Sequence, residues 1–302
     1  MRSRWDLLPL GDDDSWAGHV GLMSDRTFVA IAGAACAVAL LTGCASSTDN
    51  AKKLLNPDPP GKMYASADQY LTAGKYERAA KRFEELDRDH PYSSEARRAM
   101  VMAAYSYYKA RKFPEAIATA RRYTTMHPGT KDAALAHHII ASCYFEDMNG
   151  PRNDQTNTRK ALQELQTLKS RYPDSKYARD ASNRIRIATD TLAANEMTVG
   201  RFYLKRHNYM AAVNRFKVVV SKYQTTKHVE EGLMRLTEAY MALGLKQEAQ
   251  NAAAILGHNF PRSPWYKDSY TLLQSDGLAP REDTGSWLSQ AWKNIKLPSI
   301  NL

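Results

Sequence analysis

The chain has 302 residues, of which 43% are hydrophobic and 25% charged, and its formal net charge is +10 at neutral pH. Three cysteines are too few for the disulfide framework of a small secreted domain, so that class is excluded. A basic chain can bind nucleic acid, anionic lipid headgroups or acidic proteins, and solvated helix faces explain the charge equally well.

An apolar run over residues 28–41 ends in Leu41-Thr42-Gly43-Cys44, the pattern of a bacterial lipobox. The run is shorter than the about 20 residues of a transmembrane helix, and a small-residue cleavage site follows it. Residues 1–43 are therefore predicted to be a signal peptide. We expect Cys44 to become the first residue and to carry diacylglycerol and an N-acyl chain such as palmitate. The alternative is a short hydrophobic anchor that ends in an ordinary cysteine.

The residues around this segment refine the prediction. Asp6 and Asp12 to Asp14 stand where a signal peptide has a short basic segment, so we expect translation to start at Met23. Ala45 follows the cysteine, whereas Asp there tends to retain a lipoprotein in the inner membrane, which predicts the outer membrane, facing the periplasm. Residues 1–43 hold three Arg and five Asp, a net of -2, so the mature chain carries +12. Export argues against nucleic acid as its partner.

A polar, proline-rich stretch comes next. Residues 44–61 include Ser-Ser-Thr-Asp-Asn and Asn56-Pro-Asp-Pro-Pro-Gly61, a composition that does not bury a core. The stretch is predicted to be a flexible tether that attaches the folded part of the chain to the lipid.

The remainder contains an internal repeat. Alanines recur with spacings of 37, 45, 51 and 37 residues at Ala79, Ala116, Ala161, Ala212 and Ala249. A tyrosine precedes four of them by nine residues (Tyr70, Tyr107, Tyr203, Tyr240), and a proline follows four of them by twelve (Pro91, Pro128, Pro173, Pro261). This resembles the tetratricopeptide (TPR) pattern of two antiparallel helices. The predicted fold is an all-α solenoid of five TPR-like helix pairs.

Two irregular spacings locate additions to the repeats. Tyr144 precedes Ala161 by 17 residues instead of nine, which places an exposed loop at 147–158. The gap from Pro173 to Tyr203 is 30 residues, where the other such gaps are 16, and it predicts one long helix over 175–206, between repeats three and four. The predicted division is repeats one to three over 62–173, the long helix with repeats four and five over 174–275, and a tail over 276–302.

The tail departs from the repeat pattern. Trp287, Leu288, Trp292 and Ile295 are spaced for a short amphipathic helix. Such a helix either presents aromatic anchors to a partner or covers the open apolar face of the last repeat, and the second role is the more ordinary one.

Signals for chemistry are weak. The chain contains no His-Glu-x-x-His, Gly-x-Ser-x-Gly or phosphate-binding glycine loop. His137 and His138 are adjacent on a predicted helix and point about 100° apart, so they do not face a common metal ion. Cys143 lies among apolar neighbours and is expected to be a small buried hydrophobe. The sequence predicts no enzyme, no metal site and no cofactor beyond the lipid on Cys44.

Several marks occur together in order: the lipobox, Pro59-Pro60 followed by Tyr64-Ala65, Tyr172-Pro-Asp-Ser-Lys-Tyr-Ala178, the long helix, and Ala212-Val-Asn-Arg-Phe216. This set resembles the BamD (ComL-type) family of lipoproteins as far as about Tyr270. The resemblance implies a scaffold of the outer-membrane β-barrel assembly machine, whose C-terminal half binds the POTRA domains of BamA. It also implies other assembly lipoproteins as partners, and N-terminal repeats that receive unfolded barrel precursors. The family's contact to BamA falls on Arg215, which is otherwise an ordinary exposed arginine.

TPR geometry turns particular first-helix positions toward the concave groove. They are Tyr64, Asp68, Arg98, Tyr105, Tyr108, Lys109, His138 and Phe145. Barrel precursors typically end in an aromatic residue with a free carboxylate, which needs an aromatic slot beside a cation. We expect Tyr105 and Tyr108 with Lys109 or Arg98 to provide it, unless these tyrosines are core residues, as Tyr107 is expected to be.

Two other functions are compatible with TPR repeats. A periplasmic TPR adaptor in cell-wall or Tol-Pal processes would usually have an N-terminal coiled coil and no lipobox. An enzyme that carries TPR repeats would need a catalytic domain, and repeats, tether and tail leave no room for one.

Overall fold

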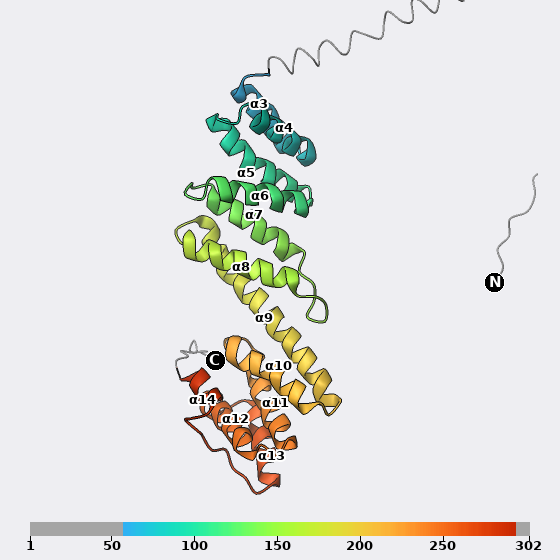
Figure 1. Cartoon of the computed structure of the whole chain (residues 1–302), viewed down its shortest axis with the longest axis vertical. Coiled ribbons are helices and arrows are strands. Elements are labelled where there is room, and N and C mark those ends of the chain that lie inside the picture. Colours follow the sequence, from blue (N-terminus) through green and yellow to red (C-terminus); the bar gives the residue numbers. More distant parts are fainter. Residues whose placement is uncertain (1–56, 294–302) are drawn as a thin grey trace, which may run out of the picture. The chain divides into compact units, whose positions relative to one another are not determined.

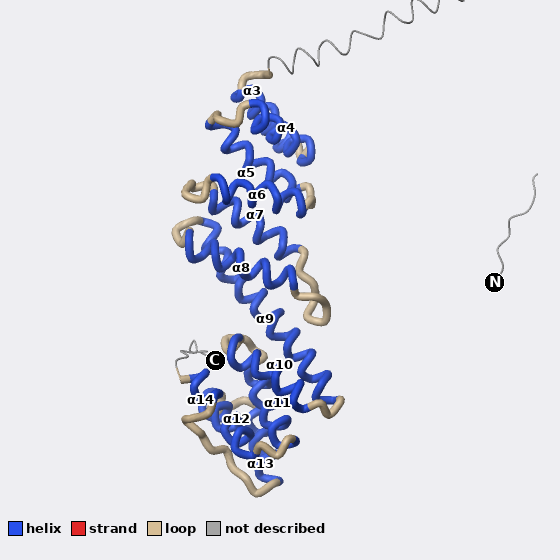
Figure 2. The backbone as a smooth tube through the Cα atoms, viewed as in Figure 1, coloured by secondary structure: helices blue, strands red, loops and turns tan. Residues whose placement is uncertain are grey.

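The structure is a computed structural model that describes residues 57–293, and this part of the chain is all-helical (Figures 1 and 2). Its twelve helices are α3 (Pro60–Thr72), α4 (Tyr76–Asp89), α5 (Ser94–Lys109), α6 (Phe113–Met126), α7 (Ala133–Glu146), α8 (Thr156–Arg171), α9 (Lys176–Lys205), α10 (Tyr209–Lys222), α11 (Val229–Ala242), α12 (Lys246–Asn259), α13 (Pro264–Ser275) and α14 (Trp287–Trp292). In residues 57–293, no helix is both long and apolar enough to span a bilayer.

The helices form a solenoid of five pairs followed by two further helices. Each of α3 to α12 packs against the next helix in the chain, and first helices also pack against the first helix of the next repeat, as α3 does with α5 and α5 with α7 (Figure 1). The predicted all-α solenoid of five TPR-like pairs is confirmed. The first helices together make one face of the array, which is where the sequence placed the groove.

The repeated alanines explain the close pairing. All five lie in second helices and are fully buried, so the small side chain allows the helix backbones to approach. Tyr107 and Tyr240 are buried opposite them, which confirms the core role predicted for Tyr107. The repeated prolines lie two residues beyond the end of their helices, because proline cannot continue a helix past that point.

The turn inside each regular pair needs a residue with positive φ. Gly74 and Gly244 hold it with φ of 71° and 74°, as expected for glycine. The same position in repeats two and four belongs to Arg111 and His207, with φ of 60° and 59°. These two residues pay a small conformational cost for the same turn.

The long helix α9 agrees with its predicted bounds to within one residue at each end. Ser175 caps it, since its hydroxyl accepts a hydrogen bond from the Ala178 amide. Its N-terminal part packs against α8 and its C-terminal part, which contains Tyr203, packs against α10. The helix is therefore also the first helix of repeat four, a more specific place than the predicted one between repeats three and four.

Loops on both sides hold the middle of α9. Asn195 donates a hydrogen bond of 2.7 Å to the carbonyl of Pro151, in the loop that joins α7 to α8. Asp190 forms an ion pair of 3.4 Å with Lys227, and its carboxylate lies 3.6 Å from the His228 ring; both residues precede α11. The long helix is thus attached to the repeats on either side of it.

Helix α13 is a first helix without a regular second one. Leu273 takes the place of the repeat tyrosine, and Gly277 supplies the turn with φ of 71°. The chain then runs back to α14, whose Leu288 and Trp292 are buried in the core of repeats four and five. This covering of the last repeat is the more ordinary of the two roles predicted for the tail, and Ile295 lies outside the described residues.

Candidate partner-binding surfaces

Arg215 lies on α10 and is accessible. Its guanidinium forms an ion pair of 3.2 Å with Glu196 of α9, and 45% of its side chain is exposed. An exposed pair of this kind contributes little to stability and exchanges readily for a new acidic partner. The side chain therefore has the position and the chemistry of an ionic contact on a rigid helix pair.

At the N-terminal end of the array, Tyr64 of α3 and Arg98 of α5 lie together. The Arg98 guanidinium is 5.3 Å from the centre of the Tyr64 ring. The Tyr64 ring also packs edge-on against Phe83, with the two ring centres 5.3 Å apart. Burial is the main cause that raises the pKa of Tyr64. An aromatic ring next to an exposed guanidinium is the combination that the sequence analysis expected for this face.

A second group surrounds Tyr108. Its hydroxyl donates a hydrogen bond to Glu146 of α7, and Arg111 forms a 3.5 Å ion pair with the same carboxylate. The Arg111 guanidinium also lies 5.3 Å from the centre of the Phe113 ring. Burial, and then the hydrogen bond to Glu146, raise the pKa of Tyr108 to about 12. The cations near Tyr108 are thus Arg111, which shares Glu146 with it, and Arg184, whose charge acts on its hydroxyl; the sequence analysis selected neither.

The third group links α7 with α9. The Arg184 guanidinium lies 5.3 Å from the ring centre of Phe145 and donates a hydrogen bond of 2.9 Å to Ser142. His138 stacks on Tyr177, with ring centres 4.8 Å apart. Phe145 and His138 both lie on α7, and the cation beside Phe145 is Arg184 of α9, which the sequence analysis did not predict.

The structure does not bring Lys109 to Tyr105 and Tyr108. Its ammonium lies 5.9 Å from the ring centre of Tyr76 on α4, whereas Tyr108 faces α6 and α7. Neighbouring helical residues point about 100° apart, so Lys109 and Tyr108 occupy different faces of α5. Tyr105 is half-buried and packs against the core of repeat two. Arg98, the other expected cation, accompanies Tyr64 instead.

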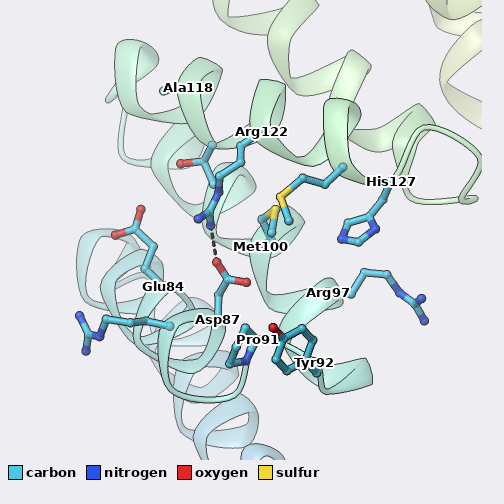
Figure 3. A pocket seen from close by; sticks show the side chains of 12 residues that line it. Glu84, Asp87, Pro91, Tyr92, Arg97, Met100, Ala118, Arg122 and His127 are labelled. Carbon is cyan, nitrogen blue, oxygen red and sulfur yellow. Dashed lines mark hydrogen bonds and ion pairs between the residues drawn. The ribbon is translucent and has the colours of Figure 1, made fainter.

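Sequence reasoning missed a hollow of about 880 Å³ between α4, α5 and α6, away from the groove residues (Figure 3). An ion pair between Asp87 and Arg122 crosses it, and Tyr92 and Arg97 lie at its edge. Its lining residues are Glu84, Asp87, Arg88, Pro91, Tyr92, Arg97, Met100, Ala118, Thr119, Arg122, Met126 and His127. Charged and apolar groups meet there, as they do in ligand-binding clefts.

His137 and Cys143, two candidates for chemistry in the sequence, both lie in buried surroundings. Residues 57–293 contain no cluster of three or more His, Cys, Asp or Glu side chains suited to a metal ion. His137 is 3.0 Å from Glu164, which also pairs with Arg121 at 3.1 Å, so this histidine joins a buried structural network. Cys143 is fully buried, and burial raises the pKa of its thiol to about 12, which keeps it protonated at neutral pH.

The predicted signal peptide, start at Met23 and lipidation at Cys44 lie outside the described residues, as does the tether before residue 57. They remain predictions from the sequence.

Comparisons with known proteins identify the family. The profile of YfiO, described as an outer membrane lipoprotein, matches residues 57–255. A Caulobacter vibrioides protein named outer membrane protein assembly factor BamD is 39% identical over 259 residues, covering 86% of this chain and 85% of its own length. A Rickettsia prowazekii protein of the same name is 36% identical over 236 residues, covering 78% of this chain and 93% of its own.

Among solved structures, the TPR2AB domain of yeast Sti1 in its pHSP90 complex has a TM-score of 0.35 and 13% identity, covering 72% of this chain and 84% of that chain. The family is shown by the match of the profile to residues 57–255 and by the identity to the two relatives over most of both chains. By these measures the chain belongs to the YfiO family of outer membrane lipoproteins, which includes the BamD proteins.

Proposed function

We propose that this chain is the lipid-anchored scaffold of an outer-membrane β-barrel assembly complex, located at the periplasmic face of the outer membrane. The observation that carries the proposal is its similarity, over most of both chains, to proteins named outer membrane protein assembly factor BamD. The partners would be a BamA-like protein with POTRA domains, other assembly lipoproteins and unfolded barrel precursors. A cell-wall or Tol-Pal adaptor is the alternative.

Arg215 is the proposed contact to the BamA-like protein. It is exposed on α10, and Glu196 orients it without burying it. A carboxylate of the partner would replace Glu196 as its ion pair. Because Arg215 is on the surface, its substitution should leave the solenoid folded while it removes the contact.

A pull-down on the tagged lipoprotein in detergent tests this proposal, with co-purifying proteins identified by mass spectrometry. Wild type is expected to recover a POTRA-containing barrel protein, and Arg215→Glu to lose it. Lys169→Glu, on the exposed face of α8, is the control with the same change of charge. Recovery of only cell-wall or Tol-Pal proteins by wild type would favour the adaptor. If Arg215→Glu recovered as much of the POTRA-containing protein as wild type and Lys169→Glu do, Arg215 would be rejected as the contact.

The groups around Tyr64, Tyr108 and Phe145 are the proposed contacts to unfolded precursors. Each combines an aromatic ring with a guanidinium within reach, from Arg98, Arg111 and Arg184 respectively. A synthetic peptide of the last residues of a barrel protein, ending in phenylalanine, should bind wild type and bind Arg98→Ala more weakly. Arg78→Ala, exposed on α4, serves as the control. Unchanged affinity in Arg98→Ala would exclude Tyr64 and Arg98 as the receiving slot.

The anchor at Cys44 is proposed from the lipobox alone. Cys44→Ser should move the protein from the membrane fraction to the soluble periplasmic fraction. Mass spectrometry of the N-terminal peptide should find diacylglycerol and an acyl chain in wild type only. A wild-type chain that starts before residue 44 without lipid would refute the anchor.

A further inference from the structure

The hollow between α4, α5 and α6 differs from the equivalent places in the other repeats. Counted from the repeated alanines, Tyr92 stands at the position occupied elsewhere by Gly129, Asp174, Thr225 and Arg262. Met126 stands where the other repeats have Asp89, Arg171, Lys222 and Asn259. Large apolar side chains thus occur at two positions that are glycine or polar in every other repeat.

Both side chains are exposed. Tyr92 has 101% of its reference area accessible to solvent and Met126 has 58%, and both line the hollow with Met100. Single exposed apolar residues are common and need no explanation. Here two of them flank one concavity at repeat positions that otherwise hold no apolar side chain, and the fold buries nothing of Tyr92 and less than half of Met126. This arrangement is typical of a surface that a partner covers.

The charges of the hollow favour an anionic occupant. Its two carboxylates are already used: Glu84 accepts a hydrogen bond of 2.8 Å from the Tyr107 hydroxyl, and Asp87 pairs with Arg122. Arg97 is exposed at the edge and forms no ion pair within residues 57–293 (Figure 3). A guanidinium next to apolar and aromatic surface recognises a carboxylate that follows or precedes an apolar side chain.

The volume favours several residues over a single chain end. Clefts of about 300 to 1,000 Å³ hold a drug-sized ligand, and this hollow, at about 880 Å³, has room for a short stretch of extended peptide. The site is also separate from the groove residues, because the ends of second helices and the loop between repeats form it.

We propose that this hollow is a docking site for an internal, acidic, extended segment of a partner protein. The segment inserts one aromatic side chain between Tyr92, Met100 and Met126 and places a carboxylate on Arg97. The Asp87–Arg122 pair forms the polar wall of the site and keeps Arg122 from competing for the carboxylate. This site is independent of the proposed contacts at Arg215 and on the first-helix face.

The test uses the purified chain without its signal peptide, labelled with ¹³C at the methionine methyl groups, whose NMR signals report directly on Met100 and Met126. The probe is the peptide Gly-Glu-Phe-Glu-Gly, acetylated and amidated at its ends. Three peptides are compared with it: one with lysine in place of glutamate, one with serine in place of phenylalanine, and Gly-Ser-Gly-Glu-Phe with a free terminal carboxylate.

The acidic aromatic peptide should shift both methyl signals saturably and more strongly than the other three. Tyr92→Ser should weaken its binding about tenfold, the usual effect of removing one aromatic anchor. Arg97→Glu should abolish binding. Arg262→Ser, at the position of repeat five that matches Tyr92, should leave it unchanged. Because Tyr92, Arg97 and Arg262 are exposed, these variants keep the fold.

Three results would overturn the proposal. Methyl signals that do not move at millimolar peptide would show that the hollow binds no such segment. An equal response to the lysine peptide would remove the role of Arg97. Tighter binding of the peptide with the free carboxylate would show that the hollow receives a chain end instead of an internal segment.

Discussion

The two halves of the array use the same face in different ways. In repeats one to three, the first helices present rings beside guanidinium groups, as in Tyr64 with Arg98 and Phe145 with Arg184. In the second half, Phe202 and Trp265 also lie beside guanidinium groups, but there the charges of the first helices pair with one another as well. Arg201 of α9 binds Glu231 of α11 at 2.8 Å, and Arg235 joins Glu231, Glu238 and the ring of Trp265 on α13.

The apolar cores of the two halves also differ. Repeats one to three contain three apolar clusters that only the partly buried Met102 and Tyr172 connect, whereas repeats four and five share one cluster that also takes in Leu273, Leu288 and Trp292 of α13 and α14. Stability in a repeat array depends on each repeat and its neighbours. A half with divided cores opens locally more easily than a half with one core. We therefore expect an adaptable N-terminal half and a braced C-terminal half.

The largest expected effect comes from placing a side chain where α9 and α10 lie too close for one, in the braced half. A Cβ on Gly200 would lie 2.4 Å from the ring of Phe216, which is fully buried between α9 and α10. Gly200→Ala should therefore lower the free energy of unfolding by about 3 kcal/mol, the upper end for overpacking. Urea denaturation followed by circular dichroism measures it. Gly61→Ala in α3 has no atom within 4 Å and should change little.

Acid should weaken the N-terminal half. Burial lowers the pKa of His138 from 6.5 to about 4, helped by Arg184 and Lys176 and opposed by Asp180. Between pH 6.5 and 4 the unfolded chain binds a proton at this site that the folded chain does not, so stability falls as the pH falls through this range. The loss is roughly 2 kcal/mol, since part of the ring is exposed.

His138→Gln should remove that part of the pH dependence, measured as the urea midpoint at pH 7 and at pH 4.5. His258→Gln, an exposed position on α12, is the control and should keep the wild-type slope. An unaltered slope in His138→Gln would mean that another group titrates in this range.

The spacing of tyrosine, alanine and proline predicted much of this fold because each residue has one physical task in the repeat. It located the five pairs, the loop before α8 and both ends of α9. It did not predict α13, because Leu273 replaces the tyrosine there and no regular second helix follows. Only Pro264 at its start and Gly277 after its end marked this helix.

The candidate sites were less predictable. The sequence placed Tyr64, Tyr108 and Phe145 on first helices but did not give their cations, since Arg111 lies in a turn and Arg184 in the next repeat. The hollow at Tyr92 depends on three helices at once. A comparison of polar and apolar residues at matching repeat positions is the signal that would have pointed to it.

Hydrogen bonds of Asn251 attach the tail segment before and within α14 to the C-terminal half. Asn251 of α12 is fully buried, donates a hydrogen bond to the Ser286 hydroxyl, and accepts one of 2.9 Å from the Asp283 amide and one of 3.1 Å from the Ser289 hydroxyl. Asn251→Ala should cost about 1 to 2 kcal/mol, because these groups lose a buried partner.

Limited proteolysis between residues 278 and 286 should be faster in Asn251→Ala than in wild type. Asn259→Ala, whose amide binds only a carbonyl of its own helix, provides the comparison and should be cut at the wild-type rate. Equal rates in all three proteins would show that the burial of Leu288 and Trp292 alone holds the tail.

The smallest effects should come from the turns with positive φ, one in each half. Replacing Arg111 or His207 by glycine relieves backbone strain, but glycine also has more freedom in the unfolded chain, so the net gain is at most about 0.5 kcal/mol. The contacts that each side chain loses decide which of the two variants is more stable. His207 gives up one exposed contact to Tyr209, whereas Arg111 gives up Glu146 and Phe113, so His207→Gly should be the more stable variant in urea denaturation. An equal gain from Arg111→Gly would mean that the cluster around Tyr108 adds nothing to the fold. Its arginine would then be held in a strained turn for binding alone.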